Sequence, residues 1–91
     1  ARAAGDKYYD RGADSYAKAL EYYIQAEASD KIGKIADDYN AKGDDLKAAE
    51  TYMLQKNESG YQKAGDIYFS KKNYDKAFEA YYAGNNFAGL K

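Results

Sequence analysis

The chain has 91 residues and carries 14 Lys plus Arg against 15 Asp plus Glu, for a net charge of -1. This length builds one small domain at most, and the balanced charge argues against a general nucleic-acid binder or a polybasic membrane binder. The chain has no Cys and no His, which excludes disulfides and cysteine-ligated zinc and removes the commonest general base and metal ligand.

The apolar residues are unusual in kind. There are 12 Tyr and 17 Ala but no Val, and Leu, Ile and Phe are scarce. We therefore expect a core in which Tyr rings fill the space left by Ala and Gly. No stretch approaches the ~20 apolar residues that cross a bilayer, and no signal-peptide pattern is seen, so we expect no membrane contact and favour a cytoplasmic location.

Apolar and small residues recur with helical spacing along the whole chain. Tyr61, Ala64, Gly65 and Tyr68, for example, follow the i, i+3, i+4, i+7 pattern of one helix face. In chain order, the pattern predicts helices over residues 2–11, 14–28, 30–42, 44–56, 58–71 and 74–84.

Turn and capping residues separate these helices. We expect a left-handed backbone between paired helices at Gly12, Gly43 and Asn73. Helix N-caps are expected at Asp14, Ser29, Asp44 and Asn73.

Two short signatures repeat along the chain. The pattern K-A-x-E-x-Y starts at Lys18, Lys47 and Lys76, at intervals of 29 residues, and the pattern D-x-Y precedes each copy, starting at Asp6, Asp37 and Asp66. The Lys and Glu of the first pattern are expected to form solvated i, i+3 pairs. The repeat predicts a single repeat domain over 1–91 with units near 1–28, 29–57 and 58–86. Residues 87–91 would start a further unit of a longer array, which we favour, or form a cap.

Small residues occupy equivalent positions in each unit. They are Gly5, Ala36 and Gly65 in the first helices, and Ala19, Ala48 and Ala77 in the second helices. A missing side chain lets two helix backbones approach closely, and we expect Tyr of the neighbouring helix to fill the remaining space.

This order of bulky, small and aromatic residues resembles tetratricopeptide repeats over nearly the whole chain. The first-helix pattern is matched by Ala1, Gly5 and Tyr8, by Ile32, Ala36 and Tyr39, and by Tyr61, Gly65 and Tyr68. The second-helix pattern is matched by Ala19 and Tyr23, Ala48 and Tyr52, and Ala77 and Tyr81. The period is 29 instead of about 34, no unit ends with Pro and the bulky position never holds Trp. The short period is similar to coat-protein, intraflagellar-transport and SNAP-type repeats, and a designed array stays an alternative.

The resemblance implies an all-α, right-handed α-solenoid of about three antiparallel helical hairpins, with a concave groove lined by the first helices. Its groove positions hold Asp6, Asp37 and Asp66, then Tyr9, Asn40 and Phe69, with Arg2, Gly33 and Gln62 one turn earlier. Three Asp beside aromatic residues favour a basic or amphipathic peptide. The alternative is that each Asp pairs with a Lys of an adjacent helix or is solvated. The Lys and Asn pattern that clamps a peptide carboxylate in some tetratricopeptide domains is absent.

The sequence therefore predicts a non-enzymatic protein–protein interaction module that binds a peptide or partner helix in the groove, with no metal, cofactor or nucleic acid. The alternatives are a structural segment of a longer solenoid or of a multiprotein assembly, with end-to-end self-association, and a designed repeat protein without a ligand. No nucleophile has an adjacent base.

Overall fold

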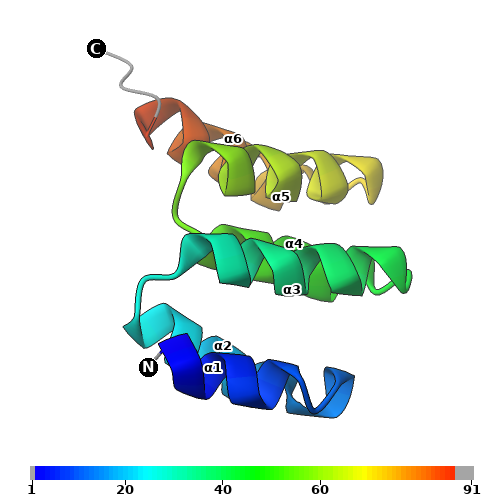
Figure 1. The fold of residues 1–91 in the computed structure, drawn as a ribbon. Coiled ribbons are helices and arrows are strands. Elements are labelled where there is room, and N and C mark those ends of the chain that lie inside the picture. Colours follow the sequence, from blue (N-terminus) through cyan, green and yellow to red (C-terminus); the bar gives the residue numbers. More distant parts are fainter. Residues whose placement is uncertain (1, 88–91) are drawn as a thin grey trace.

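The computed structural model describes residues 2–87, and these residues form six α-helices, one short 3₁₀ helix and no strand (Figure 1). The predicted all-α class is thus confirmed for this part of the chain. The elements are α1 (Arg2–Tyr9), η1 (Ala13–Ser15), α2 (Tyr16–Gln25), α3 (Ser29–Ala41), α4 (Asp45–Leu54), α5 (Glu58–Ser70) and α6 (Tyr74–Phe87).

The helices are mostly shorter than predicted. The chain leaves the first helix after Tyr9 and enters α2 through η1, so the expected continuous helix over 14–28 is broken at its start. The last helix is longer than predicted, because α6 continues to Phe87. The further unit predicted at 87–91 lies, beyond Phe87, outside the described residues.

Left-handed residues form most of the turns. Gly12 (φ 103°) and Gly43 (φ 84°) confirm two of the predicted positions, but in the third hairpin Lys72 (φ 64°) takes this conformation instead of Asn73. Glu27 and Lys56, each with a φ of 53°, do the same between hairpins. Left-handed backbone at these charged residues was not predicted, because Lys and Glu do not favour the left-handed region.

Several predicted caps are displaced by one residue or more. Asn73 acts as expected, since its Oδ1 accepts a hydrogen bond from the Lys76 amide at 3.4 Å. Asp14 lies inside η1, and Ser29 is the first residue of α3. Asp44 occupies the N-cap of α4 without a capping hydrogen bond from its side chain. Asn57, which was not predicted, caps α5 by accepting from the Gly60 amide at 2.7 Å.

Figure 1 shows three helix pairs stacked in a row, with α1, α3 and α5 in one layer and α2, α4 and α6 in the other. We call α1–α2, α3–α4 and α5–α6 the first, second and third hairpins. The smallest extent of the chain, 15 Å, fits two layers of helices whose axes lie 8–10 Å apart. Within each hairpin the two helices pack on each other, and successive hairpins meet mainly through α2 with α3 and through α4 with α5.

The core is divided between the two junctions of the hairpins. Between the first and second hairpins, Tyr16 and Tyr23 pack with Ala19, Ile32 and Ile35. At the junction of the second and third hairpins, Met53 and Ile67 pack against a cluster whose buried members are Ala and Tyr: Ala36, Ala48, Ala49, Tyr52, Ala64, Tyr68, Ala77 and Ala80. The predicted core of Tyr rings and small residues is confirmed.

Candidate functional site

Each hairpin joins an aspartate of its first helix to a tyrosine of its second helix by a hydrogen bond. The three pairs are Tyr23 with Asp6, Tyr52 with Asp37 and Tyr81 with Asp66. In every pair the phenol Oη donates to Oδ1, over 2.5 Å in the first hairpin and 2.6 Å in the third. We call this unit the Tyr–Asp clasp, and it recurs because both of its residues belong to the sequence repeat.

The tyrosine ring of each clasp lies on the small residue that precedes the aspartate. A Cβ at Gly5 would be 2.5 Å from the Tyr23 ring, and a Cβ at Gly65 would be 2.5 Å from the Tyr81 ring. Ala36 holds the same position in the second hairpin and is fully buried. The small residue thus lets the ring cross the first helix so that its hydroxyl reaches the carboxylate beyond.

The sequence predicted that the three aspartates bind a ligand, with pairing to a Lys of an adjacent helix or exposure to solvent as the alternative. Their common partner in the structure is a tyrosine hydroxyl of the same hairpin. Asp6 has in addition an ion pair with Lys31 of the next hairpin, with Nζ 3.4 Å from Oδ1. The hydrogen bond from Tyr23, followed by Lys31, holds the pKa of Asp6 below its ordinary value.

Five of the predicted site residues lie exposed on the face formed by α3 and α5. Gln62, Asp66 and Phe69 are one face of α5 at i, i+4 and i+7, and Asp37 and Asn40 are the matching residues of α3. The Phe69 side chain is 57 % exposed. Asp6 is half-buried, so the accessible acids of this face are those of the second and third hairpins.

Tyr9 was predicted to be a binding residue, but the structure uses it to join hairpins. Its hydroxyl donates to Asp38 Oδ2 at 2.5 Å, and the hydroxyl of Tyr16 donates to the same oxygen at 2.8 Å. The two rings stack with centroids 5.2 Å apart. Burial raises the pKa of both phenols above its ordinary value, with the bond to Asp38 as the next cause.

Two lysines on the same face escaped the sequence prediction. The Nζ of Lys34 lies 5.6 Å from the centre of the Tyr9 ring, and the Nζ of Lys63 lies 5.5 Å from that of Tyr52. Each precedes an aspartate, Asp37 or Asp66, by three residues. The α3–α5 face therefore alternates acidic and basic groups and is not the purely acidic surface that was expected.

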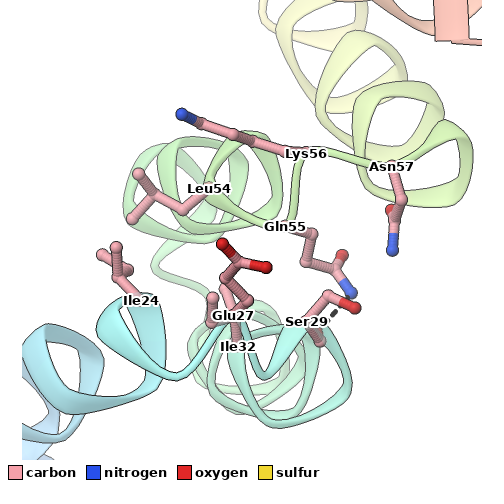
Figure 2. Close-up of a pocket in the computed structure, with 8 residues that line it drawn as sticks. All are labelled: Ile24, Glu27, Ser29, Ile32, Leu54, Gln55, Lys56 and Asn57. Carbon is pink, nitrogen blue, oxygen red and sulfur yellow. Dashed lines mark hydrogen bonds between the residues drawn. The ribbon is translucent and has the colours of Figure 1, made fainter.

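A hollow lies at one edge of the stack, beside the loops that connect successive hairpins (Figure 2). Ile24 and Leu54 form one part of its wall, and Lys56 and Asn57 border it from the loop between α4 and α5. Figure 2 shows the Gln55 side chain turned toward Ser29, whose carbonyl oxygen accepts from Gln55 Nε2 at 2.9 Å. Gln55 thus ties the second hairpin together at its open end, and its role here is structural.

The clasps make stability dependent on pH. Burial, followed by the bond to aspartate, raises the pKa of Tyr23 and Tyr52, and the bond to Asp66 raises that of Tyr81. A phenol whose pKa is higher in the folded chain than in the unfolded chain stabilises the fold. This stabilisation is complete below the unfolded-chain pKa of about 10 and is lost as pH rises toward the folded-chain pKa. Asp6 and Asp30 have lowered pKa values, Asp30 mainly through its hydrogen bond from Arg2. Their contribution is present above about pH 4 and is lost as pH falls toward the folded values.

We therefore expect the urea midpoint of unfolding to fall both above about pH 10 and below about pH 4. Circular dichroism at a series of pH values measures it. A variant with Phe at 23, 52 and 81 should show a shallower alkaline decline, since the three clasped phenols no longer titrate. An equally steep alkaline decline in the variant would contradict this role of the clasps.

The described part of the chain has neither a cluster of metal-binding side chains nor a membrane-spanning helix. Among these residues, no three of Asp and Glu are grouped so that they could hold a metal ion. None of the helices over 2–87 is long and apolar enough to span a membrane.

Comparison of the sequence with protein-family models and with curated proteins, and of the fold with solved structures, found no match.

Proposed function

We propose that the chain is a protein–protein interaction module built as a right-handed, tetratricopeptide-like solenoid, and that it binds a basic or amphipathic peptide along the α3–α5 face. The observation that supports this best is a pair of exposed aspartates, Asp37 and Asp66, each held by a tyrosine of the neighbouring helix. Three stacked hairpins with the small residue and the tyrosine in matching places support the solenoid arrangement.

The carboxylate of a clasped aspartate is oriented to accept a hydrogen bond from a charged donor. The tyrosine hydroxyl occupies Oδ1, which orients the carboxylate and leaves Oδ2 to accept from an Arg or Lys of the peptide. Less side-chain freedom is then lost on binding than with a free Asp. A hydrogen bond to a charged group contributes about 1.5–3 kcal/mol.

The other exposed residues of this face suit the same ligand. Phe69 offers an aromatic surface for an apolar side chain of the peptide. Asn40 of α3 and Gln62 of α5 are exposed, and their side-chain amides can pair with a peptide backbone. Lys34 and Lys63 add a preference, because they favour peptides in which acidic residues alternate with the basic ones.

A peptide-array screen tests the proposal with Asp37→Lys, Asp66→Lys as the site variant. The matched control is Asp14→Lys, Asp44→Lys, which changes the net charge equally at exposed acids of the turns. We expect basic peptides to bind the wild type and the control, and to bind the site variant about tenfold or more weakly. Phe69→Ala, which alters an exposed side chain, should also weaken the amphipathic peptides.

Equal binding to wild type and site variant would contradict the proposal, and so would equal losses in the two double variants, since bulk charge would then explain them. Circular dichroism of each variant shows whether the helices are retained.

A second candidate is a structural segment of a longer solenoid or multiprotein assembly. The observation that favours it is the row of exposed aromatic side chains on α6, the last helix of the stack.

A further inference from the structure

The second helix of each hairpin has three residues on one face, at i, i+4 and i+8, and in α2 and α4 this face lies toward the following hairpin. They are Tyr16, Leu20 and Ile24 in α2, Asp45, Ala49 and Met53 in α4, and Tyr74, Phe78 and Tyr82 in α6. We call each set a junction row. The rows are spaced by 29 residues, so α6 carries the third copy of a surface whose first two copies meet a following hairpin.

At the first junction, the following hairpin covers the row with α3. Tyr16 donates to Asp38, contacts the edge of the Tyr39 ring, and has the Nζ of Lys42 5.5 Å from its ring centre. Leu20 packs on the cluster that contains Ile32 and Ile35.

At the second junction, the equivalent residues of the third hairpin do the same. Asp45 Oδ2 forms an ion pair with Lys71 Nζ at 3.1 Å. Ala49 is fully buried in the cluster that contains Tyr68, and Met53 lines a small hollow with Tyr68. The first position of a junction row thus meets a lysine, Lys42 or Lys71, and a tyrosine of the following hairpin, Tyr39 or Tyr68, lies at each junction.

In the described part of the chain, the side chains of the third row, on α6, are exposed. Tyr74 is 55 %, Phe78 68 % and Tyr82 58 % exposed. Phe78 and Tyr82 stack with centroids 5.9 Å apart, and Tyr74 meets the edge of the Phe69 ring. Ala and Met are replaced here by larger aromatic residues, so this end of the stack exposes more apolar surface than an inner hairpin does.

The opposite end of the stack carries the residues that would cover such a row. Tyr8 and Arg11 occupy the repeat positions of Tyr39 and Lys42, and of Tyr68 and Lys71. Tyr8 stacks on Tyr22 with centroids 5.6 Å apart, and the Arg11 guanidinium lies 4.8 Å from the Tyr8 ring centre. Among the described residues no hairpin precedes α1. Tyr8, partly buried against the core cluster of the first junction, forms with exposed Arg11 an aromatic and cationic surface at this end of the stack.

We propose that two copies of this chain associate head to tail, with the α6 junction row of one copy covered by the Tyr8–Arg11 surface of the next. Arg11 takes the place of Lys42 over the aromatic ring at the first position, here Tyr74. Tyr8 takes the place of Tyr39 and Tyr68 against Phe78 and Tyr82. The contact continues the stacking that already joins the hairpins within one chain, and because it is heterologous it can add further copies.

Charge favours this contact over one between two α6 helices. Exposed Lys7 and Arg11 flank the Tyr8 surface, whereas exposed Asp75 lies beside Tyr74 of the α6 row. Head-to-tail contact therefore brings opposite charges together. Two α6 rows facing each other would bring two Asp75 carboxylates to one interface, which like-charge repulsion opposes.

Sedimentation velocity over micromolar to millimolar concentrations tests the proposal. We expect the weight-average mass of the wild type to rise with concentration to twice the monomer mass and beyond. Phe78→Lys and Arg11→Glu should each stay monomeric over this range, with unchanged circular dichroism. Leu46→Lys, a control at an exposed apolar residue of α4 outside the junction rows, should associate like the wild type.

Mixing the two monomeric variants distinguishes head-to-tail contact from other modes. The Arg11→Glu chain keeps the α6 row and the Phe78→Lys chain keeps the Tyr8 surface, so an equimolar mixture should form a 1:1 dimer and stop there. A wild type that stays monomeric, association of Arg11→Glu alone, absence of the mixed dimer, or loss of association in Leu46→Lys would each overturn the proposal. These results do not depend on peptide binding at the α3–α5 face, which the array measures separately.

Discussion

Replacing Tyr23 by Ala should destabilise the chain by about 3–5 kcal/mol, the range for aromatic truncations in a core. Tyr23 is 1 % exposed, its ring lies against Gly5 and its hydroxyl donates to Asp6. A domain of this size is stabilised by only about 5–15 kcal/mol, so the loss is a large share of the total. Urea unfolding followed by circular dichroism measures it.

Two control variants separate the contribution of the buried Tyr23 ring from that of its hydroxyl and from that of an exposed tyrosine ring. Tyr23→Phe keeps the ring and removes the hydroxyl, so its loss should be clearly smaller than that of Tyr23→Ala. Tyr82→Ala removes the same side chain at a position that is 58 % exposed, and its effect on monomer stability should be within about 0.5 kcal/mol. Similar losses for Tyr23→Ala and Tyr82→Ala would show that the Tyr23 ring is not a core residue.

Gly60→Ala should destabilise the chain by about 1–3 kcal/mol, the range for overpacking. In an open helix this change would instead add roughly 0.5–1 kcal/mol of stability. Gly60 lies in the first turn of α5 against α4, where an added Cβ would collide with the Tyr52 carbonyl oxygen and lie 2.9 Å from the Gln55 Cβ. Neither atom can move without moving α4 away from α5.

The control for this change is Gly33→Ala, which places its Cβ against the amide end of the same Gln55 side chain. That amide can rotate away, at the expense of its hydrogen bond to Ser29. Gly33→Ala should therefore cost less than Gly60→Ala in the same urea experiment. The reverse order, or a stabilising Gly60→Ala, would contradict the close approach of α4 and α5.

The sequence predicted the number of helices and their pairing because the 29-residue repeat and the helical spacing agree at every unit. It failed on the turns, where tertiary context decides the backbone. Lys72 is left-handed in the place that Gly43 holds one repeat earlier, because Asn73 begins the next helix as its cap. Local preference alone assigns that conformation to Asn.

The Tyr–Asp clasps were missed although both partners had been recognised. The aspartate is the first residue of the D-x-Y signature and the tyrosine is the last residue of K-A-x-E-x-Y. Their common repetition was the available signal, since two residues that recur together in paired helices can lie side by side. For the aspartates, a ligand, a Lys of an adjacent helix and solvent were considered, because spacing shows which residues share a face but not which side chain crosses between helices.

The exposed row on α6 also had a signal in the sequence. Phe78 and Tyr82 stand where the first unit has Leu20 and Ile24 and the second unit has Ala49 and Met53, so apolar residues recur at these two positions in every unit. The lysines of the α3–α5 face were missed for a simpler reason, since Lys34 and Lys63 precede the aspartates by one turn and the prediction considered the acids alone.

The central claim is that a tyrosine ring of the second helix lies directly on the small residue of the first helix in each hairpin. Proton NMR tests it through the Hα protons of Gly5 and Gly65, which would lie under the rings of Tyr23 and Tyr81. We predict Hα resonances moved upfield by the ring current, with nuclear Overhauser contacts to the ring protons of the paired tyrosine. Hα shifts typical of an exposed helical glycine, without those contacts, would contradict the account.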